Sequence, residues 1–290
     1  MTHTCKCYAT VNGIRMAYTE SGAGDPIVFV HGNPTSSYLW REVIAEVAGL
    51  GRCLAPDLIG MGDSDKLPDS GPAAYAFVEH RAYLDGWFDA VGVRERVTLV
   101  GHDWGAALAF DWARRHPDAV SGIAYMEAPV APARWTDLPP QVAELFRALR
   151  SPAGEQMILE QNMFIETILP SGVLSPLSDE AMTEYRRPYT TPGESRRPTL
   201  TWPRQIPIDD DPEEVAQIMR GYASWLAGSN IPKLFVNADP GQVLTGAARE
   251  FCRAWPNQTE VTVSGRHFIQ EDAGADIGRA IAGWLQTGNR

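Results

Sequence analysis

The chain of 290 residues is long enough for one large α/β domain, or for a core domain with an insertion. Its formal net charge of −11 argues against nucleic acid as a partner and disfavours an anionic membrane surface, because both attract clustered basic side chains. Four cysteines are too few for a disulfide framework, and no apolar run approaches the roughly 18–20 residues that span a bilayer. The amino-terminal sequence MTHTCKCYATVNG lacks the apolar stretch of a secretory signal, so we expect a cytoplasmic protein, with the periplasm as the alternative.

Short β-rich runs alternate with longer helical patterns along most of the chain. Nearly all-apolar runs such as IVFV and VTLV are typical of central strands in a parallel sheet that is covered on both faces. The helical pattern at 73–92 places Tyr75, Val78, Ala82, Trp87 and Val91 toward one side. We therefore predict an α/β fold with a mostly parallel sheet of eight strands at 8–11, 15–20, 27–30, 52–55, 97–100, 122–126, 233–237 and 260–263.

The alternation of strands and helices stops between about residues 129 and 230. This region contains several helical segments and many prolines, as in EAPVAPARWTDLPP, but no convincing strand. We predict that residues 129–211 form a helical cap and that residues 1–128 and 212–290 form the core domain. An insertion between two parallel strands would lie over the carboxyl edge of the sheet, where α/β folds place their active sites.

A turn motif follows the predicted strand at 97–100. Gly101-His102-Asp103-Trp104-Gly105 has the Gly-x-nucleophile-x-Gly spacing of a nucleophile elbow, and a helical pattern begins directly after it. The elbow usually presents serine, but here it presents Asp103. An aspartate could also simply cap the helix, although capping does not require the two flanking glycines.

An aspartate in this position favours attack on a saturated carbon. Serine would form an ether there, which water cannot easily cleave, whereas aspartate forms an ester with a carbonyl that activated water can hydrolyse. Aspartate is also ionised at neutral pH, so the first step needs no general base. The motif therefore indicates displacement at an alkyl carbon by Asp103.

The second step needs a base, and the base needs an acid that orients it. Of the six histidines, His267 follows a predicted strand near the carboxyl terminus, which matches the order nucleophile, acid, histidine along the chain. Glu127 and Asp239 both follow predicted strands and are the two candidate acids. We favour Glu127, because it lies immediately before the predicted cap and because ADPG around Asp239 is a natural turn sequence.

The segment VFVHGNPTSS supplies a second loop after a buried strand. The backbone N–H groups of Asn33 and Trp104 are placed to form an oxyanion hole for ester hydrolysis. The carboxamide of Asn33 and the indole N–H of Trp104 are side-chain donors that suit a leaving halide. A turn at Asn33 or core packing of Trp104 would explain each residue alone, so the pair carries the hypothesis.

Six segments together resemble the haloalkane dehalogenases of the α/β-hydrolase superfamily: HGNPTSSYLWR, DLIGMGDSDK, GHDWGAALAFDWARRHPD, GIAYMEA, RRPTLTWPRQIP and SGRHFIQED. The resemblance extends from about Tyr8 to Leu285. It is closest to the subfamily whose acid follows the sixth strand, which includes enzymes of hexachlorocyclohexane degradation. GHDWG also occurs in epoxide hydrolases, whereas HGNP together with MEA and WPRQIP is more specific to the dehalogenases.

The resemblance implies an α/β-hydrolase fold with an inserted helical cap, and a detoxifying hydrolase that needs no metal or cofactor. It implies Asp103 as nucleophile, His267 as base and Glu127 as acid, with a halide such as chloride held by Asn33 and Trp104. The partners would be a small halogenated organic substrate and water, and we favour a monomer. The products would be an alcohol, a halide and a proton.

The resemblance also suggests three apolar positions in the pocket wall, and it leaves other functions open. Pro203, Phe164 and Phe268 match wall positions, although plain core packing explains each equally well. An epoxide hydrolase could use the same aspartate and histidine, with Tyr185 and Tyr189 as proton donors; Asn33 counts against it, because epoxide hydrolases resemble HGFP. A luciferase-type monooxygenase on this scaffold, or a receptor without catalysis, is a more distant alternative.

Overall fold

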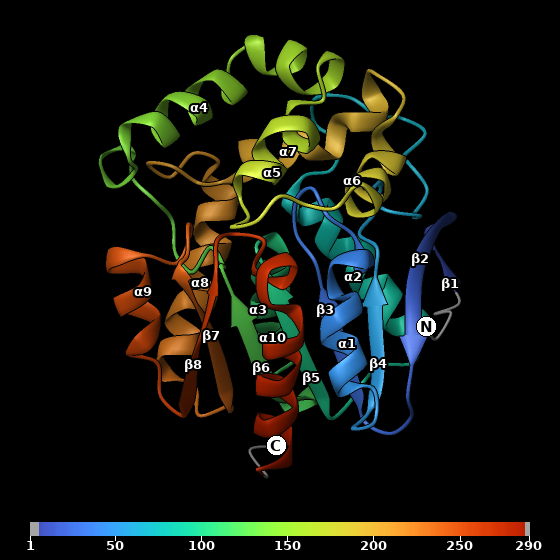
Figure 1. Ribbon diagram of the computed structural model, residues 1–290, viewed down its shortest axis with the longest axis vertical. Coiled ribbons are helices and arrows are strands. Elements are labelled where there is room, and N and C mark those ends of the chain that lie inside the picture. The colour runs from blue at the N-terminus through green and yellow to red at the C-terminus, as the bar shows by residue number, and fades with distance from the viewer. Residues whose placement is uncertain (1–5, 288–290) are drawn as a thin grey trace.

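The structure is a computed structural model that describes residues 6–287 (Figure 1). The prediction about a secretory signal depends partly on residues 1–5, which lie outside the described residues. The described chain contains a single eight-stranded sheet with the order β1-β2-β4-β3-β5-β6-β7-β8. Its strands are β1 (Lys6–Val11), β2 (Ile14–Ser21), β3 (Pro26–Val30), β4 (Arg52–Pro56), β5 (Val97–His102), β6 (Val120–Met126), β7 (Lys233–Pro240) and β8 (Gln258–Gly265).

The sheet is mostly parallel, as the sequence predicted. β2 pairs antiparallel with β1 and with β4, and every other neighbouring pair is parallel. Each of the eight predicted ranges lies within an observed strand. Because β3, β5, β6, β7 and β8 run in the same direction, the loops that follow them meet at one edge of the sheet.

Helices cover both faces of the sheet (Figure 1). On one face, α1 (Arg41–Val47) and α10 (Ile269–Gln286) pack against each other and share a core with apolar side chains of the strands. On the other face lie α2 (Phe77–Ala90), α3 (Trp104–Arg115) and α8 (Glu213–Gly228), with a larger core cluster. Shorter elements are η1 (Ser37–Trp40), η2 (Pro117–Ala119) and α9 (Gly246–Arg253).

The buried face of α2 differs from the predicted one. Tyr75 precedes the helix and Ala82 is exposed. The side chains that α2 buries follow a helical spacing of three and four residues and are Phe77, His80, Leu84, Trp87 and Phe88. Trp87 of the predicted side is buried, but Phe77 and Leu84 are buried where Ala82 is not, because burial of these larger side chains removes more apolar surface from water.

All regular elements in residues 129–211 are helical, and Figure 1 shows them gathered at one end of the sheet. The main helices are α4 (Pro140–Arg150), α6 (Asp179–Arg186) and α7 (Arg197–Gln205). Shorter turns complete the cap: η3 (Trp135–Asp137), η4 (Glu155–Glu160), η5 (Phe164–Ile168), α5 (Leu169–Ser171), η6 (Arg187–Tyr189) and η7 (Glu194–Arg196). Residues 129–211 contribute to two small apolar clusters, one of which also includes Leu39 and Phe268 from outside this segment.

An α-helix needs about 20 mostly apolar residues to cross a lipid bilayer. Within residues 6–287, no helix combines that length with sufficient apolar character.

Candidate active site

Asp103 lies in the sharp turn between β5 and α3, as the motif predicted. β5 ends at His102, α3 begins at Trp104, and Asp103 between them has φ 51° and ψ −131°. Such dihedrals are costly for a residue with a side chain and are typical of functional turns. The turn also depends on Gly105, where a Cβ atom would lie 2.1 Å from the carbonyl oxygen of Val30.

The loop after β3 brings backbone donors to the Asp103 carboxylate. The Asn33 N–H donates to Asp103 Oδ1 over 2.8 Å. The backbone N–H of Trp104 also lies near the carboxylate and helps to lower its pKa. Gly32 permits this approach, because a Cβ there would lie 2.2 Å from Asp103 Oδ1. The two amides that the sequence suggested as an oxyanion hole therefore converge on the same carboxylate.

His267 lies just after β8 and contacts both predicted carboxylates. Its Nε2 is 3.5 Å from Asp103 Oδ2, and its Nδ1 is 3.4 Å from Glu127 Oε2. Burial would lower the pKa of His267, but hydrogen bonds and charges from Asp103 and Glu127 raise that pKa to about 9. Burial would raise the pKa of Asp103, but its hydrogen bond to His267 and the nearby imidazoles lower it. Asp103 is therefore ionised at neutral pH.

Glu127 follows β6 and is completely buried, with φ 45°. Three successive backbone N–H groups, of Gln242, Val243 and Leu244, donate to its carboxylate over 3.0, 2.7 and 3.3 Å. These donors come from the loop after β7 and stabilise the ionised carboxylate. Asp239, the other candidate acid, is exposed at the end of β7. The structure thus brings Glu127, and not Asp239, to His267.

Two further histidines, His31 and His102, hold the loops of the site in place through hydrogen bonds. His102 Nε2 lies 2.7 Å from the carbonyl oxygen of His267, and burial lowers the pKa of His102 to about 3. His102 is therefore neutral and donates from Nε2, which fixes the backbone of His267. His31 accepts a hydrogen bond at Nε2 from the Leu58 N–H over 2.9 Å, and burial lowers the pKa of His31 to about 4. Their position beside glycines in two loop motifs was the available signal.

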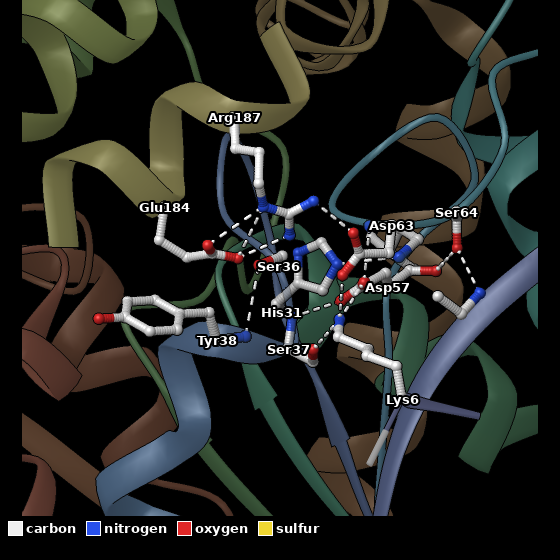
Figure 2. A network of polar contacts seen from close by, with 12 residues as sticks. Lys6, His31, Ser36, Ser37, Tyr38, Asp57, Asp63, Ser64, Glu184 and Arg187 are labelled. Atoms are coloured by element: carbon white, nitrogen blue, oxygen red, sulfur yellow. Dashed lines mark hydrogen bonds and ion pairs between the residues drawn. The ribbon is translucent and has the colours of Figure 1, made fainter. Parts of the chain in front are cut away.

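A polar network supports the Asn33 loop from behind and reaches the cap (Figure 2). Buried Asp57 accepts hydrogen bonds from the N–H groups of Ser37 and Asp63 over 2.7 and 2.8 Å. Lys6 forms ion pairs with Asp57 and Asp63 and donates to the Ser37 hydroxyl. Arg187, from η6 of the cap, also forms an ion pair with Asp63. The loop that carries Asn33 is thereby linked to the cap by charged side chains.

The two predicted halide donors come from two loops: Asn33 lies in the loop after β3, and Trp104 directly follows Asp103 after β5. Asn33 is 4% exposed, and its Nδ2 donates to the Thr199 carbonyl oxygen of α7 over 3.4 Å. Trp104 is 2% exposed, and its ring stacks on Trp202 of α7 at a centroid distance of 4.8 Å. Both donors belong to the core domain, and α7 of the cap contacts both. The two side chains that the sequence predicted as halide donors are therefore both covered by α7.

The three predicted wall residues have different surroundings. Phe268 is buried and packs edge-on against His267 at a centroid distance of 4.7 Å. Pro203 is buried inside α7, four residues after the Thr199 carbonyl that Asn33 contacts. Phe164 is partly buried and packs against a cap cluster that includes Leu200. Phe268 thus lies beside His267, and Phe164 lies beside the Leu200 cluster. Pro203 belongs to the helix whose Thr199 carbonyl contacts Asn33.

The arrangement combines an ionised carboxylate, a histidine and a second carboxylate that holds the histidine. Asp103 Oδ1 accepts the hydrogen bond from the Asn33 N–H and Oδ2 faces His267, so Oδ2 is the oxygen available for attack. His267 Nε2 is beside Oδ2 and can accept a proton from water that approaches the same carboxyl carbon. Such a site can form an ester on Asp103 and then hydrolyse it.

Comparisons with known proteins agree with this geometry. The family described as alpha/beta hydrolase fold matches residues 25–274. A haloalkane dehalogenase of Sphingobium indicum is 58% identical over 281 residues, 97% of this chain and 95% of the relative. A solved haloalkane dehalogenase structure from Bradyrhizobium elkani has a TM-score of 0.92 and 40% identity, with 98% of each chain covered.

A relative of different activity is also similar to this chain. A coelenterazine h 2-monooxygenase of Renilla reniformis is 40% identical over 270 residues, 92% of this chain and 86% of the relative. The identity to the Sphingobium dehalogenase is higher and extends over more of the chain. The chain therefore belongs to the alpha/beta hydrolase fold family and, within that family, to the haloalkane dehalogenases.

Proposed function

We propose that the protein hydrolyses haloalkanes to an alcohol, a halide and a proton, with Asp103 as the nucleophile. In the first step, Asp103 Oδ2 attacks the halogen-bearing carbon, the carbon–oxygen bond forms, and the halide leaves with the bonding electron pair. The product is an alkyl ester on Asp103. Only 15% of the Asp103 side chain is exposed, so a bound substrate would strip most water from the carboxylate and increase its reactivity.

In the second step, His267 accepts a proton from water, and the resulting hydroxide attacks the ester carbonyl. The N–H groups of Asn33 and Trp104 stabilise the oxyanion that forms on Oδ1. The alcohol leaves with a proton, and Glu127 stabilises the imidazolium in the interval. Esterification removes the negative charge of Asp103, one of the two carboxylates that raise the pKa of His267. The pKa of His267 therefore falls when its role as a base begins.

The observation that carries this proposal is the pair of contacts that His267 makes. One ring nitrogen faces the Asp103 carboxylate and the other faces Glu127, which three backbone amides hold in place. A carboxylate nucleophile that shares its histidine with a second carboxylate is suited to forming and then hydrolysing an ester. A receptor without catalysis would have no use for this arrangement.

We assign halide binding to the side chains of Asn33 and Trp104, and covering of the site to residues 129–211. α7 of this segment contacts both donors, which supports the assignment of the segment as a cap. The substrate would be a small halogenated organic molecule. The monomeric state and the cytoplasmic location expected from the sequence stay predictions.

Epoxide hydrolysis is less well supported, because neither of the cap tyrosines that would donate a proton is hydrogen-bonded to Asp103 among the described residues. The Tyr185 hydroxyl donates to Glu271 over 2.5 Å. The ring of Tyr189 is buried and faces the ammonium group of Lys66.

The first experiment measures the reaction. The protein is incubated with 1-bromobutane and 1,2-dibromoethane, and the release of bromide and acid is followed. We expect both products to appear in equal amounts. Styrene oxide is tested in parallel, and its turnover without halide release from a broad haloalkane panel would overturn the proposal.

The second experiment separates the two steps with His267→Phe. This variant keeps Asp103 but lacks the base, so we expect one equivalent of bromide and a stable alkyl ester on the Asp103 peptide, detected by mass spectrometry. His116→Phe is the matched control, because His116 is exposed at the end of α3, and it should turn over like the wild type. Failure of the ester to accumulate would contradict the division of roles.

A further inference from the structure

We propose that Pro203 is a positioning residue for the halide donor Asn33. Because proline has no backbone N–H, it leaves the carbonyl of Thr199 free, and this carbonyl fixes which end of the Asn33 carboxamide serves the halide. The proposal rests on the halide role assigned above to Asn33. It gives Pro203 a function through hydrogen bonding in addition to its apolar surface.

Pro203 interrupts the backbone hydrogen bonding of α7. In an α-helix, the N–H of each residue donates to the carbonyl four residues earlier. Position 203 would therefore donate to Thr199, but proline cannot. Pro203 lies inside α7 (Arg197–Gln205), and Thr199 is completely buried. A buried carbonyl without a partner is costly, so the Thr199 carbonyl needs a donor from outside the helix.

Asn33 supplies that donor. Its Nδ2 is 3.4 Å from the Thr199 carbonyl oxygen, across 166 positions in the sequence. Its Oδ1 is buried and accepts no hydrogen bond from the described residues. Rotation of the carboxamide by 180° would place Oδ1 against the Thr199 oxygen, which is unfavourable because both atoms are acceptors. The Thr199 carbonyl thus selects the orientation in which the nitrogen faces α7.

This orientation has a consequence for halide binding. The carboxamide nitrogen carries two N–H groups, and the Thr199 carbonyl uses one of them. The other is available to the halide that leaves the substrate carbon when Asp103 attacks it. In the opposite orientation, the carboxamide oxygen would face the anion and repel it. The Thr199 carbonyl, which Pro203 leaves without a helical donor, therefore turns the nitrogen of the Asn33 carboxamide, and not its oxygen, toward the halide.

Two variants at position 203 test the proposal. Pro203→Ala and Pro203→Val both restore an N–H that can bond to Thr199, and valine keeps most of the apolar volume. We expect the dissociation constant of sodium bromide, measured by tryptophan fluorescence at constant ionic strength, to rise about tenfold in both. Turnover of 1-bromobutane should show a lower kcat/KM. Pro198→Ala is the matched control, because its N–H would lie in the first turn of α7, where helices have no internal acceptor.

A double-mutant cycle with Asn33→Ala distinguishes positioning from packing. Without the carboxamide, the change of Pro203 to Ala or Val should alter the bromide dissociation constant by less than about twofold. An equal loss with and without Asn33, or no loss at all, would overturn the proposal. If Asn33→Ala alone leaves bromide binding unchanged, the halide role assigned above fails instead.

A measurement on the wild type covers the case in which both variants at position 203 fail to fold. The side-chain amide protons of Asn33 can be assigned in an ¹⁵N-correlated NMR spectrum by their disappearance in Asn33→Ala. We expect one of the two protons to exchange with water more slowly than the other, because it is bonded to Thr199. Equal and fast exchange of both protons would overturn the proposal.

Discussion

The two halves of the active site are held in different ways. The loops at the carboxyl edge of the sheet hold their carboxylates with backbone N–H groups, two on Asp103 and three on Glu127. The cap contacts the core through side chains, some polar, such as Arg187 with Asp63 and Tyr185 with Glu271, and some apolar, such as Trp202 with Trp104. Figure 2 shows the first of these contacts. Backbone N–H groups thus position the catalytic carboxylates, whereas side-chain contacts position the cap over them.

This difference has an energetic meaning. Removal of one partner from a buried, hydrogen-bonded carboxylate strongly destabilises the folded protein, because the remaining partners stay buried without water or a hydrogen bond. Ion pairs near the surface contribute about 0–1 kcal/mol and are screened by salt. Arg187 and Asp63 are 44% and 21% exposed in their side chains. The catalytic loops should therefore respond strongly to single substitutions, and the cap contact weakly.

The largest effect is expected at the acid. In Glu127→Gln the three backbone donors meet a carboxamide, whose nitrogen cannot accept their hydrogen bonds, and His267 loses its charge partner. We expect kcat for 1-bromobutane to fall about 10²–10⁴-fold, the range associated with loss of general-base support. Because ester formation needs no base, burst release of bromide should survive while steady-state release slows by the same factor as kcat.

Asp239→Asn provides the matched control for that prediction. Asp239 is an exposed carboxylate at a strand end, and the same acid-to-amide change there should alter kcat by less than about twofold. A larger loss at Asp239 than at Glu127 would reverse the assignment of the acid. Circular dichroism of both variants shows whether the fold is retained.

The sequence allowed good prediction wherever local patterns determine the structure. The eight strands follow from short apolar runs, and the elbow at Asp103 follows from two glycines between a strand and a helix. The choice between Glu127 and Asp239 was harder, since both follow strands of the same sheet. Three N–H groups from another loop decide it, and such a tertiary arrangement leaves no local pattern.

The cap was predicted only as a helical region, for a physical reason. Two of its segments, η4 and η5, are π-helical, as in the hydrogen bond from the Gln161 N–H to the Gln156 carbonyl. A hydrogen bond that spans five residues implies a wider turn than the α-helical turn, whose bonds span four, so these segments depart from the 3.6-residue period by which apolar patterns reveal an α-helix. The partner of the Thr199 carbonyl was also hidden, because Asn33 is distant in sequence.

The two reaction steps should depend on pH in different ways. The pKa of Asp103 is lowered, so ester formation should not vary with pH above about 5. Ester hydrolysis needs neutral His267, so its rate should fall as pH decreases, about tenfold per unit below the pKa of the alkyl enzyme. That pKa should lie below 9, the value favoured by two carboxylates, since the ester leaves only Glu127 charged.

Single-turnover kinetics measure the two steps separately, with bromide release for the first and decay of the ester for the second. In Glu127→Gln, the residual hydrolysis should shift to lower pH, because the last carboxylate beside His267 is gone. The Asp239→Asn control should keep the wild-type profile. A pH dependence that appears in ester formation instead would mean that protonation of His267 controls the nucleophile.

The smallest effect is expected at the contact between cap and core. Arg187→Gln removes the cap partner of Asp63, but Asp63 keeps Lys6, and Arg187 is partly exposed. We expect the free energy of unfolding to fall by less than about 1 kcal/mol, with kcat nearly unchanged. The wild type should approach the stability of the variant as sodium chloride increases from 0.05 M to about 1 M, since salt screens the ion pair. Arg279→Gln is the control, because Arg279 pairs with Asp276 on α10, away from the cap.

A further measurement shows whether the contact between Arg187 and Asp63 affects only the stability of the protein or also the loop that carries Asn33. Arg187 is linked through Asp63 to Lys6 and Asp57, and Asp57 binds the N–H of Ser37 behind the Asn33 loop. If the loop depended on the cap, Arg187→Gln would weaken bromide binding as well as unfolding stability. We expect no such loss, because the N–H groups of Ser37 and Asp63 hold Asp57 without help from Arg187. A bromide dissociation constant several-fold above that of Arg279→Gln would show that the cap and the catalytic loops are one cooperative unit.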